Sequence, residues 1–496
     1  MNNTPRKGGD VSHIIEGPAN RRAAAAPRKR LTAEAAVVML ACLGQFLVVL
    51  DASVVNVALP SISNDLHFSV TGLSWVTNAY AATTAGLLMI GGRAVDIFGR
   101  KPIFIYGVAV FTVGSLLCGV AQSSEMLVVC RFVQGSGAAA IGPASLAILM
   151  TSFPEGQRRA KALGTWSAVG AAGGAVGNLV GGVLTDTLSW RWVFLINLPV
   201  GAFVLLLTLR YLDWGKESAG RRLNLSGVIT ITLGLSLIDF GVIQAADHSW
   251  GSLRTMLPIV AGILSLAGFL VLQVKSSQDP LIPVRVLKSI PVTTANFAMF
   301  ATGAAFFSMW YFVSLYLQDV RHYTPLETGL AFLPQTVTVV LFARVLTPKL
   351  LHRTSPRYVV MLGASLSVIG FLAQSRMGLS GSYLMTVAVP GIFVTAGMGL
   401  LFTPLATVAT GGAARADAGV VSGLINTSRQ VGGSIGLATM VTVAAFRSRS
   451  VRGDDISGQS AEQVLSAGYS WVFLAAAVLI VIGVLPLLLT AAGKPD

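Results

Sequence analysis

The feature that most constrains the fold is a series of long apolar segments that recurs from residue 35 to residue 492. Each segment is long enough to cross the ~30 Å hydrocarbon layer of a bilayer as a helix. We expect fourteen of them, near 35–59, 71–91, 102–120, 124–150, 161–184, 192–212, 225–246, 254–274, 291–318, 327–348, 356–376, 381–408, 417–446 and 468–492. Charged residues make up only 11% of the chain, against about 25% in soluble domains. The sequence therefore predicts an all-α polytopic membrane protein and excludes a large soluble domain.

Polar stretches divide this series of segments. Residues 213–224 and 275–290 are polar and flank two apolar segments. We therefore expect a disordered basic cytosolic tail (1–34), an N-terminal six-helix half (35–212), a two-helix insert with its flanking loops (213–290), a C-terminal six-helix half (291–492) and a cytosolic C-terminus (493–496). An arginine followed by small residues occurs both at 131–140 and at 428–436, which hints at repeated halves. Repeated halves around a site at mid-membrane depth are typical of transporters.

The basic residues alternate across the predicted membrane. Of the 35 Lys and Arg residues, 26 lie in the two tails and in the loops on the same side, and 7 lie in the opposite loops. Cytosolic loops carry an excess of Lys and Arg, so both termini are expected in the cytosol of a multi-pass plasma-membrane protein. This topology also accounts for the net charge of +14. The sequence contains no basic patch interleaved with aromatic residues, so we expect no nucleic-acid partner.

Ionisable residues within the apolar segments are the first candidates for function. Among the carboxylates, Asp51 and Asp239 fall deep within such segments. Burial disfavours the ionised form of a carboxylic acid, so both are proton-coupling candidates, with a hydrogen-bonded packing role as the alternative. Arg131 stays charged and needs either Asp51, at similar predicted depth, or backbone carbonyls as its partner. For Arg429 a partner side chain or backbone carbonyls remain equally open.

Two glycine-containing stretches are candidates for gating and close helix packing. Gly92, Asp96, Gly99, Arg100 and Lys101 lie in a loop predicted after the second segment, where a plain charged turn is the alternative. The fifth segment contains small residues four apart, which predicts a close-packing face. Its glycines of interest are Gly164, Gly173, Gly177, Gly181 and Gly182.

The segment 291–318 is crowded with aromatic residues. Phe300, Phe307 and Tyr311 are seven and four residues apart and share one helical face. This face is expected to line a cavity for apolar or aromatic compounds, with lipid contact or packing as the alternative.

Several kinds of chemistry have no signature in the sequence. The five histidines lie in predicted loops or the tail, no HExxH motif is present, and the three cysteines fall within apolar segments. No Walker A motif is present either. We expect no cofactor and no metal, and an ion gradient as the energy source.

The motifs together resemble the fourteen-helix drug:proton antiporters of the major facilitator superfamily. Residues 50–60 are similar to the family pattern LDxTxVNVALP, and the loop at 92–101 to GxLADRxGRK. Leu127, Arg131, Gln134, Gly135 and Gly137 match the fourth-helix signature, and Trp190, Arg191, Trp192, Asn197 and Pro199 the start of the sixth helix. The antiporter pattern Gx8Gx3GPx2GG fits the fifth segment, with Asn178 in place of its proline.

The resemblance implies a major facilitator fold and exchange of an amphipathic antibiotic or drug for protons by alternating access. It implies proton transfer at Arg131 and a gate at residues 92–101. We count Asn56, Phe300, Phe307, Tyr311 and Arg429 as candidate substrate contacts. Export of an endogenous metabolite or siderophore, uptake by symport, and a non-transporting membrane receptor or enzyme are the alternatives.

The charge distribution predicts that residues 447–467 lie outside the cell. A cysteine introduced at Ser457 should therefore react with an impermeant thiol reagent on intact cells, whereas one at Ser218 should not. Protection at Ser457 together with labelling at Ser218 would reverse the topology.

Overall fold

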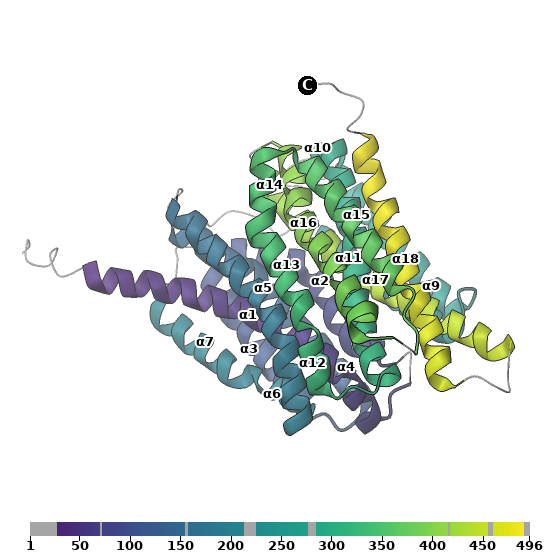
Figure 1. The fold of residues 1–496 in the computed structure, drawn as a ribbon. Coiled ribbons are helices and arrows are strands. Elements are labelled where there is room, and N and C mark those ends of the chain that lie inside the picture. The colour runs from purple at the N-terminus through teal and green to yellow at the C-terminus, as the bar shows by residue number, and fades with distance from the viewer. Residues whose placement is uncertain are drawn as a thin grey trace, which may run out of the picture.

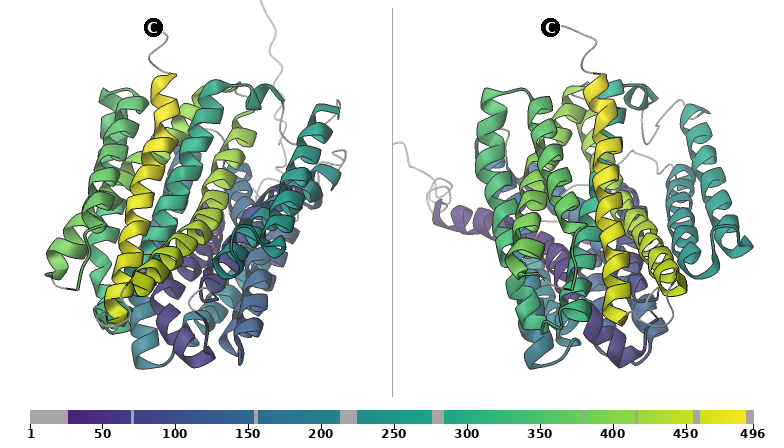
Figure 2. Two further views of the ribbon diagram at one scale, coloured as in Figure 1. Left: turned by 90° about the vertical axis from the view of Figure 1, so that its right-hand side faces the viewer. Right: turned by 45° about the vertical axis from the view of Figure 1, so that its right-hand side comes forward.

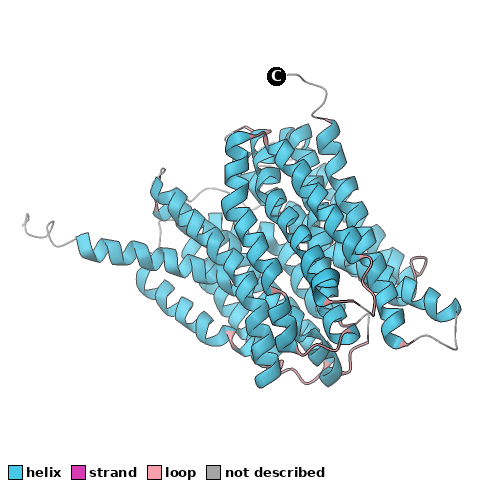
Figure 3. Ribbon diagram, in the orientation of Figure 1, coloured by secondary structure: helices cyan, strands magenta, loops and turns pink. Residues whose placement is uncertain are grey.

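The computed structural model describes residues 27–69, 72–153, 157–212, 225–275, 284–379, 381–414, 417–454 and 460–490. Within these ranges the chain consists of helices and short loops, with no strand (Figure 3). The predicted all-α class is therefore confirmed.

The helices fall into two groups and a hairpin (Figure 1). The N-terminal group contains α1 (Pro27–Leu66), α2 (Ser74–Phe98), α3 (Arg100–Gly119), α4 (Ser124–Ser152), α5 (Gln157–Thr187), α6 (Trp192–Leu195) and α7 (Asn197–Tyr211). The hairpin consists of α8 (Leu225–His248) and α9 (Leu253–Lys275). The C-terminal group contains α10 (Val284–Leu287), α11 (Ile290–Leu315), η2 (Tyr316–Val320), α12 (Pro325–Ala331), α13 (Leu333–Leu341), η3 (Phe342–Leu346), α14 (Thr347–Arg353), α15 (Pro356–Gln374), η4 (Leu384–Ala388), α16 (Val389–Gly411), α17 (Ala418–Asp454) and α18 (Ala461–Leu489).

Many of these helices are long and apolar enough to cross a bilayer. Eleven described segments meet that condition, and η2, η3 and η4 are π-helical turns that continue their neighbours. The chain is thus a multi-pass membrane protein. The expected number of fourteen spans stays a prediction.

Three helix ends differ from those expected. α2 continues to Phe98, so Gly92 lies within a helix and only Gly99 separates α2 from α3. Gly99 has φ 85°, a conformation that glycine adopts without strain and that permits the immediate reversal. α17 continues to Asp454 because the arginines expected in the following loop are good helix formers. α1 begins at Pro27, inside the segment expected to be a disordered tail, and proline is favourable at a first helical position.

The packing of the N-terminal group is repeated in the C-terminal group. α1 packs along α5 as α11 packs along α17, and α3 packs along α4 as α15 packs along α16. α17 is therefore the counterpart of α5. Residues 131–140 of α4 and 428–436 of α17 are therefore similar in sequence without occupying equivalent positions, and the repeat of the two groups is seen in the helix packing instead.

The two groups meet at the end of the bundle that carries residues 188–191 and 321–324, here called the contact end. Ser314 Oγ donates to the carbonyl of Asn56 at 2.7 Å, and Gln318 Nε2 donates to that of Val57 at 3.0 Å. A Cβ atom at Gly182 of α5 would lie 2.5 Å from the carbonyl oxygen of Pro325. Glycine at this position therefore lets α5 and α12 touch through their backbones.

The groups diverge toward the opposite end, which carries the C-terminus of α18 and is here called the terminal end (Figures 1 and 2). There α1, α3 and α7 lean away from α14 and α18 (Figure 1). A long side chain connects η3 to α5 at this end: Arg344 Nη2 donates a hydrogen bond to the carbonyl of Gly164 at 3.2 Å. A Cβ atom at Gly164 would have no neighbour within 4 Å. Helix contact is thus tight at one end and loose at the other.

An ion pair fixes the start of α17 outside the spanning segments. Arg285 of α10 donates to both carboxylate oxygens of Asp417, each at 2.7 Å. These hydrogen bonds lower the pKa of the Asp417 carboxyl. The pair therefore stays ionised at neutral pH and ties α10 to the loop before α17.

The packing of α5 predicts opposite outcomes for two of its glycines. A Cβ atom at Gly177 would overlap Ser53 Oγ and lie 3.0 Å from the carbonyl of Leu50, whereas one at Gly164 meets nothing. Gly177→Val should lower the free energy of unfolding by about 1–3 kcal/mol through overpacking, and Gly164→Val should leave it close to that of the wild type. Thermal denaturation of the purified variants in detergent measures both. Equal melting temperatures would contradict the packing described.

Candidate functional site

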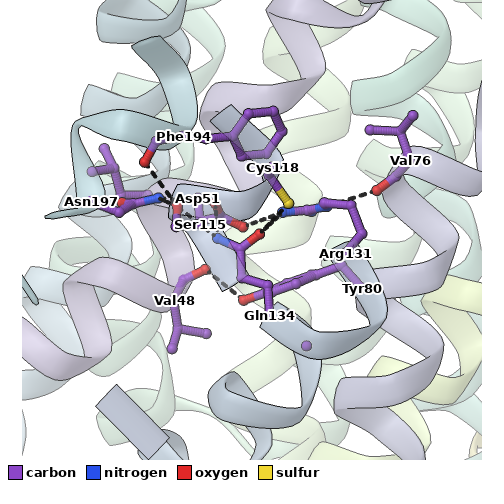
Figure 4. Close-up of polar contacts among 12 residues, drawn as sticks. Val48, Asp51, Val76, Tyr80, Ser115, Cys118, Arg131, Gln134, Phe194 and Asn197 are labelled. Carbon is purple, nitrogen blue, oxygen red and sulfur yellow. Dashed lines mark hydrogen bonds and ion pairs between the residues drawn. The ribbon is translucent and has the colours of Figure 1, made fainter. Parts of the chain in front are cut away.

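The carboxylate of Asp51 lies at the centre of a fully buried polar cluster between α1, α3, α4 and α7 (Figure 4). Its Oδ2 accepts a hydrogen bond from Arg131 Nη1 at 2.6 Å. Its Oδ1 accepts from Gln134 Nε2 at 2.7 Å and from Asn197 Nδ2 at 3.0 Å. Three protein donors therefore take the place of water around the buried carboxylate of Asp51.

Arg131 is satisfied from three directions. Besides Asp51, its Nε donates to the carbonyl of Val76 at 2.9 Å and its Nη1 to Gln134 Oε1 at 2.7 Å. The guanidinium lies over the ring of Tyr80, 4.3 Å from the ring centroid. The sequence left open whether Arg131 is paired with a carboxylate or with a backbone carbonyl, and the structure shows that it bonds to both.

A serine completes the cluster on the side of α3. Ser115 Oγ accepts from Gln134 Nε2 at 3.1 Å and from Asn197 Nδ2 at 3.0 Å, and it donates to the carbonyl of Phe194 at 2.8 Å. The thiol of Cys118 donates weakly to Gln134 Oε1 at 3.7 Å. Both amide side chains are therefore oriented by a second partner besides Asp51, which fixes their donors on the carboxylate.

Glycines bring α3 and α4 close enough for these contacts. A Cβ atom at Gly114 would lie 2.9 Å from the backbone of Gln134, and one at Gly137 would lie 2.5 Å from the backbone nitrogen of Phe111. Small residues at such crossings allow backbones to approach in a membrane. Ser115 can reach Gln134 because the preceding residue, Gly114, has no side chain to keep the two helices apart.

The sequence identified part of this cluster. Asp51 and Arg131 were singled out by the cost of burying charge, and Gln134 and Asn197 were noted only as parts of family motifs. Ser115 and Tyr80 were missed, because a serine or tyrosine in an apolar helix has no distinguishing pattern. Asp239 lies in α8, but its side chain is outside the described residues.

The residues expected to form a gate lie where α2 meets α3. Arg100 donates to Thr151 Oγ1 of α4, and Lys101 Nζ donates to the carbonyl of Leu212 at 2.5 Å. These bonds tie α3 to its neighbours in the N-terminal group. The side chain of Asp96 is outside the described residues, and a gating role for this junction stays a prediction.

The glycine face of α5 packs on α1 beside Asp51. A Cβ atom at Gly173 would lie 3.4 Å from the carbonyl of Phe46, and one at Gly181 would lie 2.6 Å from that of Val54. Ser53 Oγ donates across this interface to the carbonyl of Gly173 at 3.2 Å. The close-packing face therefore extends over Gly173, Gly177 and Gly181, and Gly164 lies outside it.

Asn178 faces the other group of helices. Its carbonyl oxygen would lie 2.7 Å from a Cβ atom at Gly329 of α12, so these two backbones are also in close contact. Its Oδ1 is buried and has no hydrogen-bond partner among the described residues. The residue that replaces the family's proline thus lies at the contact between the groups.

The candidate substrate contacts lie on several helices rather than in one cluster. Tyr311 is buried, whereas Asn56, Phe300 and Phe307 are half-buried. The ring of Phe307 would lie 2.8 Å from a Cβ atom at Gly433 of α17, so packing explains part of this face. Arg429 lies with its guanidinium 5.6 Å from the ring centroid of Phe402.

The sequence pattern of the Major Facilitator Superfamily matches residues 41–437. The chain belongs to this superfamily. It is 40% identical over 466 residues to the cephamycin export protein CmcT of Amycolatopsis lactamdurans, and the match covers 93% of each chain. It is 36% identical to the puromycin resistance protein pur8 of Streptomyces alboniger, covering 82% of this chain and 81% of the relative.

Solved structures of the superfamily share the fold. A bacterial homolog of the human lysosomal transporter Spinster matches with a TM-score of 0.64 at 16% identity, covering 93% of this chain and 97% of the other. A peptide transporter matches with a TM-score of 0.65 at 16% identity, covering 92% and 94%. The major facilitator fold and the resemblance to antibiotic and multidrug exporters of the superfamily, both expected from the motifs, are therefore confirmed.

The geometry of the buried pair predicts non-additive effects on stability. Arg131→Gln leaves the Asp51 carboxylate buried without a cation, and loss of one partner of a buried pair costs about 3–5 kcal/mol. The double variant Arg131→Gln/Asp51→Asn removes both charges and should be more stable than Arg131→Gln alone. Denaturation of both variants in detergent measures the difference. A double variant that is less stable by the sum of the single effects would show that the two residues act independently.

Proposed function

We propose that this superfamily member exports an amphipathic antibiotic or drug across the plasma membrane in exchange for protons. The observation that carries the proposal is the buried carboxylate of Asp51, which is paired with Arg131 at mid-membrane depth in a chain related to antibiotic exporters. A carboxylate in the hydrocarbon region is costly and is retained where it carries protons or contacts substrate. We also place both termini in the cytosol, on the basis of the charge distribution.

Asp51 is the proposed proton carrier, and Arg131 responds to its state. Protonation removes the charge that Arg131 neutralises, which weakens their contact at 2.6 Å. Asn197 Oδ1 is buried without a partner among the described residues, and it can accept the new O–H of Asp51 once the amide turns. Loss of the proton restores the ion pair. The cluster therefore has two hydrogen-bonding arrangements that differ by one proton.

Alternating access is proposed between two six-helix halves, 35–212 and 291–492, with 213–290 as an insert. The halves touch at the contact end and diverge at the terminal end. With the terminal end in the cytosol, this is the arrangement open to the cytosol. The opposite arrangement requires that α5 and α12 separate and that the terminal ends of the halves approach each other.

The proposed substrate contacts are Asn56, Phe300, Phe307, Tyr311 and Arg429. The names of the relatives, which refer to cephamycin export and to puromycin resistance, support an amphipathic antibiotic as the substrate class. Phe300 and Phe307 retain accessible surface on α11, whereas Tyr311 becomes available only if α11 moves.

Asp51→Asn should abolish transport driven by a pH gradient, because the amide keeps the shape of the side chain but cannot carry a proton. Substrate-for-substrate exchange without a gradient should persist, since it requires only the movement of the halves. Uptake of a cephamycin into inside-out proteoliposomes, with and without an imposed pH gradient, measures both activities.

Lys349→Gln, at the terminal end of α14, is the control for a lost charge remote from Asp51. Gradient-driven accumulation by Asp51→Asn at the rate of the wild type would remove Asp51 from the coupling mechanism. Loss of both activities, in a variant that is still folded, would assign Asp51 to the movement itself rather than to the proton.

A further inference from the structure

Arg429 is a cation within the membrane that the described chain does not neutralise. It lies in α17 nine residues after Val420, hence roughly 14 Å along the helix from the start of the span. Its guanidinium lies over the ring of Phe402, and no described residue forms a hydrogen bond or an ion pair with it. The side chain is half-buried, so it remains accessible at this depth.

Arg131, which also lies within a spanning helix, shows what a structural role looks like in this protein. Arg131 is 1% exposed and is satisfied by a carboxylate, an amide oxygen and a backbone carbonyl. Arg429 has an aromatic ring in place of these three acceptors. A guanidinium presents five N–H donors, and at Arg429 none of them has a hydrogen-bond partner among the described residues.

Two polar side chains that precede Arg429 in α17 form hydrogen bonds with other residues. Ser428 Oγ donates to Asn296 Oδ1 of α11 at 2.9 Å, and Asn426 Nδ2 donates within α17 to the carbonyl of Ser422 at 3.1 Å. The backbone of Arg429 itself packs against Gly303 of α11. Neither of these two side chains forms a hydrogen bond with the guanidinium.

The charge balance at mid-membrane depth leaves no described carboxylate for Arg429. Asp51 is already paired with Arg131. The other described carboxylates belong to helix ends or loops, namely Glu34, Asp65, Glu125, Asp186, Asp319, Glu327, Asp417 and Glu462. An unneutralised cation in the hydrocarbon region costs about 2.5–3.5 kcal/mol on insertion scales, so its retention favours a role that uses the charge.

We propose that Arg429 binds a carboxylate of the exported compound, which makes amphipathic carboxylic acids the preferred substrate class. The proposal rests on the export function proposed above and specifies its substrate. The planar guanidinium can donate two parallel hydrogen bonds to one carboxylate. The ring of Phe402 holds the guanidinium from one face by cation–π attraction and leaves its N–H edges free. The aromatic residues of α11 then contact the apolar part of the compound.

The test compares two probes that differ only in charge, a cephamycin with its free carboxylate and the methyl ester of the same compound. Binding to the purified full-length protein in a neutral detergent is measured for both, so that no gradient and no anionic lipid contributes. The wild type should bind the acid at least ten-fold more tightly than the ester.

Three variants assign this preference to a residue. Arg429→Gln should abolish the preference for the acid and leave the affinity for the ester unchanged, and Arg429→Lys should retain part of it through its charge. Arg447→Gln is the matched control, because Arg447 also lies in α17 and over an aromatic ring, 5.3 Å from that of Trp471. It should behave as the wild type.

Three outcomes would overturn the proposal. The first is a wild type that binds the acid no better than the ester, including one that binds neither. The second is an Arg429→Gln variant that keeps the preference or loses affinity for both probes equally. The third is rescue of Arg429→Gln by Asp239→Asn, which would reveal an internal ion pair. If binding depends on Arg429 but no gradient drives transport, the proposed export function fails and the assignment of Arg429 stands.

Discussion

The ion pair between Asp51 and Arg131 is the interaction on which the N-terminal group depends. Both side chains are removed from water, and a buried charge is tolerated only when it is paired and hydrogen-bonded. The cluster draws its donors and acceptors from α1, α3, α4 and α7, so that these four helices can occupy only positions that satisfy it. The apolar residues around the cluster add packing, but packing alone does not fix how a helix is rotated.

The same helix that carries Asp51 also carries the contact between the groups. Ser53 bonds to α5, and the carbonyls of Asn56 and Val57 accept hydrogen bonds from α11 and η2. These positions lie within two turns of Asp51 on one continuous helix. A change in the partners of Asp51 that rotates or shifts α1 must therefore alter the contact end as well. Since the glycines of α5 leave no side chains between the backbones, even a small shift changes this interface.

The sequence predicted the membrane class and the charged pair, because the length of apolar segments and the cost of buried charge are properties of single residues and segments. It could not predict that Asp51 and Arg131 meet, since equal depth leaves the direction of each side chain open. Helix ends at Phe98 and Asp454 were misjudged because polar residues also continue a helix at the membrane surface. The glycine face was predicted as a set, but which glycines touch another helix depends on where α1 crosses α5.

The contrast between Arg131 and Arg429 shows how surroundings decide the role of one residue type. Arg131 bonds to a carboxylate of α1, a backbone carbonyl of α2 and an amide oxygen of its own helix, so its donors are used within the protein. Arg429 lies where α17 crosses α11 and α16, and its backbone is pressed against Gly303 while its side chain meets a ring. A ring attracts the cation without taking up its N–H donors. The described packing can therefore hold the guanidinium in place while its hydrogen-bonding capacity remains for a group that comes and goes.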